Sequence, residues 1–383
     1  MSRVYDTGRV CSNMDIEYEG HLNKPDLLSL YLDVEPLYKL LHSYVRSKLN
    51  LRFPDEAYPD AKEANITQYI QEVPGNWTWM YEWAEERYVS MGLKVIYMCT
   101  EKTEEHLQTI LHLLAHLQYF QHMTQLPFFY RQGANEAFQE AIANLFTLVF
   151  TSPTHLYAHG FGSVAINVPL TEEVQMNYLL HVAMALLPTL PYFLGLEVWR
   201  WKVYQGVYTE EEWNCEYWRL RKYYSGVLPT VYRSIENLDM LATHQLAHAQ
   251  TGSRHFTAIF MTFQILEALC EEEGHKGPLH TCDLFGARKA GARLAKAMSL
   301  GASHPWPFTY RILTQQTTID SAALLHYFRP LQKWLKEDRM KAGAGGIPGW
   351  GGELSPMGGG RDGRACGDMK DWRTPWRKEK ERQ

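Results

Sequence analysis

The 383-residue sequence lacks several features that define common protein classes. It has no CxxC pair, and its six cysteines are too few for a dense disulfide scaffold. Its net charge of −5 gives no general attraction to nucleic acid, and no nucleic-acid-binding motif is present. Internal repeats and sustained β alternation are also missing. With 45% apolar residues, the sequence indicates a globular, mainly α protein that does not bind nucleic acid.

The sequence also contains few signals for export or for anchoring in a membrane. The start, "MSRVYDTGRV", has no apolar core, so we expect no signal peptide there. The most apolar run, residues 179–196, contains His181, Pro188 and Pro191, which favours a buried helix pair or a kinked core helix over a membrane span. Asn65 and Asn76 begin glycosylation sequons, which are usable only if the chain enters the secretory pathway.

Apolar residues at helical spacing predict helices along most of the chain. We expect them at residues 26–50, 78–91, 101–124, 136–150, 171–187, 191–204, 209–225, 255–273, 286–299 and 319–337. Short strands are expected only near 94–99 and 163–168. Residues 342–383 are rich in glycine and then charged, which predicts a disordered tail after a domain at 1–341.

The segment "TILHLLAHLQYF", residues 109–120, places two histidines four residues apart on a predicted helix. His112 and His116 therefore lie one turn apart on the same face, where both imidazoles can reach one metal ion. Glu140, on the next predicted helix, is a candidate third ligand. The alternative is that two core or surface imidazoles share this spacing by chance, since the chain has 16 histidines.

The surroundings of this segment resemble the angiotensin-converting-enzyme family of zinc metallopeptidases. "HLQYF" is followed by "LPFFYRQGANEAFQEAI" and "TSPTHL", as in that family. Four later motifs follow in the family's order: "WRWKVYQG", "FQILEALCEEEGHKGPLHTCDLF", "AGARLAKAMSLGASHPWPF" and "LLHYFRPLQKWL". The resemblance covers residues 20–340 and implies a large multi-helix fold around a central cleft with few short strands. The chain is truncated relative to the family, with gaps near 50–75 and 93–94.

The resemblance implies that zinc is the cofactor and that His112, His116 and Glu140 are its ligands. In this family a Glu directly after the first histidine is the general base, and here that position is Leu113. Leucine cannot accept a proton, and losing a general base costs about 10²–10⁴-fold in rate. We therefore expect a catalytically inactive or strongly impaired protein. The alternative is an active peptidase that releases C-terminal dipeptides and uses another base, such as Glu136.

Three further parts of the sequence depart from the family pattern. Asn144 replaces an Asp that orients a zinc-ligand histidine, and such losses reduce metal affinity by about 10–100-fold. Gly252 and His255 replace two tyrosines, the second of which stabilises the oxyanion. The segment "LATHQLAH" has no lysine to hold a substrate carboxylate. The three retained ligands thus favour zinc binding, whereas Asn144 and the gap near 93–94 argue against it.

Other functional expectations rest on single positions. The resemblance implies chloride binding by Arg221 and Arg254. Cys270 and Cys282 flank a turn-rich loop that they could close into a ring, and both match a family disulfide. The family suggests peptides or a protein as partners and an extracellular or membrane-associated location. A third hypothesis is that the chain is an incompletely folded product of a degenerate gene.

Overall fold

The computed structural model describes residues 22–52, 103–159, 170–227, 229, 233–247 and 252–341. Helices make up the regular structure of these residues, and no strand occurs among them. The mainly α fold is therefore confirmed. The helix expected at 78–91 and the strands expected near 94–99 and 163–168 lie outside the described residues.

Most described helices lie where apolar periodicity predicts them. The α-helices are α2 Lys24–Arg52, α4 Glu104–His122, α5 Glu136–Phe150, α6 Pro153–Ala158, α8 Glu172–Leu186, α9 Thr189–Tyr204, α10 Trp213–Leu220, α11 His244–Ala247, α12 Ser253–Glu272, α13 Arg288–Ser299, α14 Trp306–Thr314, α15 Ala322–Tyr327 and α16 Arg329–Lys341. Short 3₁₀ or π turns are η2 Phe128–Tyr130, η3 Arg221–Ser225, η4 Asp239–Ala242 and η5 Leu279–Thr281.

Four details differ from the expectation. Helices α6, α11 and α14 were not predicted, and the helix expected at 319–337 is divided at Phe328 into α15 and α16. Two of the missed helices, α6 and α14, carry proline in their first turn. Proline fits that position because the N–H it lacks has no partner inside the helix. In sequence, however, it resembles a loop signal.

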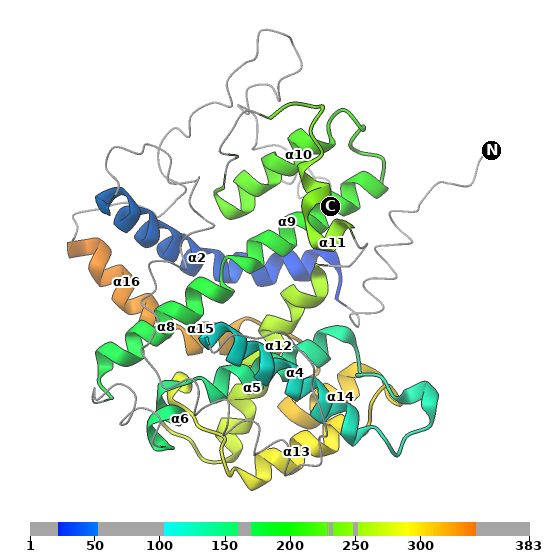
Figure 1. The fold of residues 1–383 in the computed structure, drawn as a ribbon, viewed down its shortest axis with the longest axis vertical. Helices are drawn as coiled ribbons and strands as arrows, with labels where there is room; N and C mark the ends of the chain where they lie inside the picture. The colour runs from blue at the N-terminus through cyan, green and yellow to red at the C-terminus, as the bar shows by residue number, and fades with distance from the viewer. Residues whose placement is uncertain are drawn as a thin grey trace.

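The core is centred on α5, which packs between α4 and α12 (Figure 1). Helix α12 is apolar on nearly all sides and is buried almost continuously from Phe256 to Leu266. Such a helix requires cover on every face, and α5, α9, α14 and α15 provide it. Across the α5–α12 contact, the Thr262 hydroxyl donates to the Ala141 carbonyl oxygen at 3.3 Å. This packing fixes the start of α12 relative to α4 and α5.

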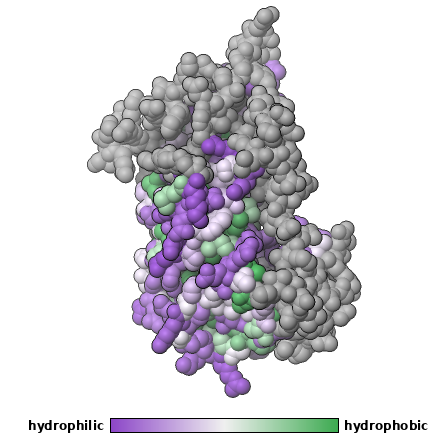
Figure 2. All heavy atoms as spheres, turned by 90° about the vertical axis from the view of Figure 1, so that its left-hand side faces the viewer, coloured by the Kyte–Doolittle hydropathy of each residue, from purple (hydrophilic) through white to green (hydrophobic). Residues whose placement is uncertain are grey.

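The most apolar run of the chain folds as two helices. Glu172–Tyr204 is, within the described ranges, the one stretch long and apolar enough to cross a membrane by length and composition, and half of its most apolar window is buried. It divides into α8 and α9, which contact each other, and Leu179, Leu190 and Leu194 from this run lie in the core. A buried helix pair was one of the two arrangements expected from the sequence. On the face shown in Figure 2, hydrophilic side chains predominate among the described residues and apolar ones are scattered.

A disulfide links the end of α12 to the segment that follows it. Cys270 forms a disulfide with Cys282, twelve residues later, as the family resemblance implied. The last described helix ends at Lys341. The tail 342–383 and the family gap near 50–75 fall on residues outside those that the structure describes, except for 50–52 at the end of α2. The domain boundary after 341 therefore stays a prediction.

Candidate metal centre

Capping residues and one hydrogen bond set the register of α4 against α5. Thr103 caps α4 by accepting from the His106 N–H, and Asn135 caps α5 by accepting from the Phe138 N–H. Between the two helices, the buried Tyr119 hydroxyl accepts from the Ala134 N–H at 3.1 Å. Tyr119 therefore ties the last turn of α4 to the residue just before the cap of α5.

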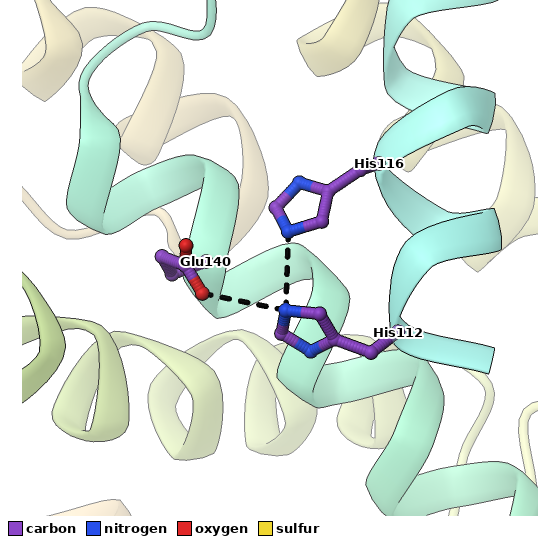
Figure 3. Close-up of side chains that lie close together, drawn as sticks. All are labelled: His112, His116 and Glu140. Carbon is purple, nitrogen blue, oxygen red and sulfur yellow. Dashed lines mark hydrogen bonds and ion pairs between the residues drawn. The ribbon is translucent and has the colours of Figure 1, made fainter. Parts of the chain in front are cut away.

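This register brings the three predicted metal ligands together (Figure 3). The Nε2 atoms of His112 and His116 lie 3.1 Å apart, and Nε2 of His112 lies 3.4 Å from Oε2 of Glu140. All three side chains are partly buried, and their ligand atoms lie within 4.8 Å of one another. The two helices thus direct two imidazoles and one carboxylate toward a common point.

These distances fit a tetrahedral zinc ion. Zinc binds imidazole nitrogen and carboxylate oxygen at about 2.0–2.2 Å, so two ligand atoms of a tetrahedron lie about 3.3–3.5 Å apart. The observed separations of 3.1 and 3.4 Å are close to that value. Two imidazoles and one carboxylate also form a donor set typical of zinc sites that keep one position open for water. The residues His112, His116 and Glu140 could therefore hold zinc.

The protonation states at neutral pH suit metal binding. Burial alone would raise the pKa of Glu140, but its hydrogen bond with His112 and the nearby imidazoles of His112, His116 and His255 lower it below its usual value. Burial, followed by the neighbouring His112, lowers the pKa of His116. Glu140 is therefore ionised and His116 neutral, which are the forms that bind a metal.

A cavity of about 360 Å³ lies beside the cluster, and both His112 and Leu113 line it. Much of its wall is apolar, with Ile259 and Phe263 from α12 among the lining residues. The Leu113 side chain is 38% exposed, because it faces this space rather than the core. The residue that follows His112 in the sequence thus presents an apolar side chain to the cavity.

The support behind the histidines is incomplete. In the described part of the chain, Nδ1 of His116 is buried without a hydrogen-bond partner. Asn144 lines the cavity together with His112, yet no hydrogen bond joins it to either histidine among the described residues. A metal-ligating histidine ordinarily donates its other N–H to an acceptor, which orients the ring and strengthens the ligand. The structure therefore shows one imidazole that lacks this support.

The start of α12 completes the surroundings of the cluster. Arg254 donates through Nη1 to Oε2 of Glu136 at 2.9 Å and through Nε to Nε2 of His255 at 3.1 Å. The His255 ring stacks on Phe193 at a centroid distance of 5.1 Å, and burial lowers its pKa. His255 is therefore a neutral imidazole whose Nε2 already accepts a hydrogen bond.

Gly252 has a structural reason to be glycine in this fold. Its N–H donates to the buried Glu197 carboxylate at 2.6 Å, and an added Cβ would lie 3.3 Å from Phe193 and 3.4 Å from Glu197. Such contacts are tighter than most that a Cβ makes, so the neighbours would have to shift. A larger side chain at position 252 would therefore require Phe193 and Glu197 to move.

The two arginines expected to bind chloride, Arg221 and Arg254, lie in different surroundings. Arg221 donates to the Ser225 hydroxyl at 3.3 Å and lies over the Tyr192 ring, 4.8 Å from its centroid. Arg221 and Arg254 stand on different elements, and chloride binding at either stays a prediction. Asn65 and Asn76 lie outside the described residues.

The comparison with known proteins agrees with this geometry. A family model described as "Angiotensin-converting enzyme" matches residues 93–350, which is more than half of the chain. The chain belongs to the angiotensin-converting enzyme family. The matched region contains all three residues of the cluster, the cavity that Leu113 lines and the start of α12.

Individual relatives in the family are similar over most of this chain. Angiotensin-converting enzyme of Rattus norvegicus is 29% identical over 399 residues, which cover 87% of this chain. The enzyme of Oryctolagus cuniculus is 30% identical over 402 residues, or 85% of this chain. Angiotensin-converting enzyme-like protein Ace3 of Mus musculus is 29% identical over 392 residues. The chain spans 30% of the length of the first two relatives and 53% of the third.

Proposed function

We propose that this protein is a zinc-binding member of the angiotensin-converting enzyme family whose peptidase activity is lost or strongly impaired. The observation that carries the proposal is Leu113, whose apolar side chain lines the cavity directly beside the His112, His116 and Glu140 cluster. When bound, zinc would polarise a peptide carbonyl or a water molecule. Hydrolysis also needs a base that takes a proton from the attacking water, and leucine has none to offer.

Among the described residues, the carboxylates near the cluster do not supply a substitute base. Glu140 is the proposed ligand, and Glu136 is paired with Arg254 at 2.9 Å. Glu105 lines the same cavity but stands seven residues before His112, about two helical turns or roughly 10 Å along the axis. A general base must lie within hydrogen-bond reach of the proton it accepts, so none of these three fits the task.

If hydrolysis is lost, the function that we propose is the binding of a peptide or a protein partner. A largely apolar cavity beside a metal with an open position suits a short peptide or a segment of a protein partner. The family relationship supports an extracellular or membrane-associated location. The Cys270–Cys282 disulfide supports the same placement, because such bonds persist in oxidising compartments.

The first test measures zinc content and peptide hydrolysis on the same preparation. We expect His116→Ala to lose one equivalent of zinc relative to the wild type, and we expect no release of dipeptides from a short peptide with a free C-terminus. His326→Ala is the matched control, because His326 pairs with Glu267 and no third ligand joins them among the described residues. Wild-type turnover that a chelator and Glu140→Gln both abolish would show an active peptidase instead.

A second measurement separates impaired chemistry from incomplete folding. Thermal or urea unfolding of the isolated chain should be cooperative, because α5 and α12 form one continuous core with the helices around them. A chain that aggregates or unfolds without a transition would support the degenerate-gene alternative.

A further inference from the structure

A second group of metal-ligand side chains lies away from the proposed centre. His155 stands in the last turn of α6, His159 caps the same helix, and Asp283 follows the disulfide residue Cys282. Nδ1 of His155 lies 3.0 Å from Oδ1 of Asp283, and Nε2 of His159 lies 3.6 Å from Oδ2 of the same carboxylate. The three groups offer ligand atoms within 4.8 Å of one another.

We propose that His155, His159 and Asp283 form a second zinc(II) site. The spacing repeats that of the first cluster: two histidines at i and i+4, here one in α6 and one at its C-cap, and a carboxylate from another segment. The histidine rings lie 4.5 Å apart here, against 4.8 Å between His112 and His116. Each histidine nitrogen lies near a different oxygen of Asp283, Oδ1 at 3.0 Å and Oδ2 at 3.6 Å, and both separations are close to the ligand–ligand distance of about 3.3–3.5 Å in a tetrahedral zinc site.

The fold holds these side chains in place from both sides. Ser152 caps α6 and accepts from the His155 N–H, which fixes the helix that carries both histidines. Asp283 accepts from the Phe285 N–H at 2.9 Å, and the preceding Cys282 is covalently linked to α12. Preorganised ligands of this kind lower the ordering cost of binding a metal.

The proposed second site is enclosed on one side by aromatic rings and is exposed to solvent on the other. His155 is 1% exposed and its ring packs edge-on against Phe150 at 5.1 Å, while the His159 ring lies 4.0 Å from that of Phe285. The side chains of His159 and Asp283 keep 24% and 20% of their surface exposed. Aromatic walls exclude bulk water on one side, and the exposed side admits zinc and leaves a fourth position for a water ligand. Bound zinc would join the end of α6 to the segment that follows the disulfide.

The test is the zinc stoichiometry of the full chain after equilibrium dialysis against micromolar Zn²⁺, measured by elemental analysis. The variant His112→Ala/His116→Ala should keep one equivalent, and adding His159→Ala to it should remove that equivalent. The control His326→Ala, at the histidine that pairs with Glu267, should change nothing in either background. Because the two sites are emptied separately, failure of this proposal and failure of the proposed first centre give different results.

A second readout covers the case in which a variant folds poorly. Co²⁺ added to His112→Ala/His116→Ala should give visible d–d absorption, and the isosteric change Asp283→Asn in that background should weaken its binding at least tenfold. Zn²⁺ should also raise the melting temperature of His112→Ala/His116→Ala. Less than one-fifth of an equivalent in that variant, or unchanged stoichiometry in the His159→Ala and Asp283→Asn variants, would overturn the second site and leave His155 and Asp283 as a metal-free hydrogen-bonded pair.

Discussion

Replacing Leu113 by glutamate should restore hydrolysis if loss of the general base is what limits this protein. The position tolerates the change because Leu113 is 38% exposed and lines a cavity, so a carboxylate there stays hydrated. Leucine and glutamate have similar helix propensities. The packing lost with the leucine side chain is worth about 1–2 kcal/mol, since only part of it is buried.

The expected gain follows from what a positioned base contributes. Proton transfer by a general base is worth about 10²–10⁴-fold, or roughly 3–5 kcal/mol of barrier. The buried Nδ1 of His116, which has no hydrogen-bond partner in the described region, and the neutral His255 are left unchanged by this substitution. Leu113→Glu should therefore exceed Leu113→Gln by that factor and still remain a slow peptidase.

The assay compares dipeptide release by the two variants at equal zinc content. Leu113→Gln matches glutamate in size and polarity but cannot act as a base, so it isolates proton transfer from changes in cavity shape. Equal turnover of Leu113→Glu and Leu113→Gln, with zinc bound to both, would refute the reasoning. That result would indicate that the main defect lies elsewhere, in the orientation of the histidines or at the Gly252 position.

Three further predictions concern stability. Tyr119→Phe leaves the Ala134 N–H without its acceptor and should lower the free energy of unfolding by about 1–3 kcal/mol, measured by urea titration, with zinc affinity falling as the α4–α5 register loosens. Replacing Cys270 and Cys282 together by serine opens a twelve-residue loop and should cost about 3 kcal/mol, seen as a lower melting temperature that the reduced wild type shares. Burial, followed by a nearby imidazole, lowers the pKa of His280 to about 4. Because the unfolded chain takes up this proton first, stability should fall as pH drops from about 6.5 to 4, by at most about 1.4 kcal/mol per unit. His280→Gln should remove that slope, and an unchanged slope between pH 7 and 5 would contradict the assignment.

The sequence predicted the cluster of His112, His116 and Glu140 because the signals for it are a helical spacing and short local motifs. The spacing of His112 and His116 sets one helix face, and the motif around Glu140 places the third group on the next helix. What it could not predict depends on contacts between distant segments. The pairing of Arg254 with Glu136 joins the starts of α12 and α5, and nothing in either local pattern indicates it.

The second cluster was missed for a related reason. His155 and His159 have the same i and i+4 spacing as the first pair, and that spacing was the available signal. Their helix, α6, is only six residues long and begins with proline, so no sustained periodicity marks it. Asp283 lies 124 residues after His159 in the chain, and only the packing brings its carboxylate to the two rings.

Packing explains how the geometry of the His112, His116 and Glu140 cluster can form beside a leucine at position 113. His112, His116 and Glu140 occupy helices whose register is set by core contacts, including the Tyr119 bond to Ala134. Those contacts stabilise the fold whether or not a peptide is cleaved. Leu113 instead faces a cavity, so its identity is only weakly coupled to stability. In this fold the geometry of the cluster is therefore a consequence of folding, and on the function that we propose the residue beside His112 decides what a bound metal can do.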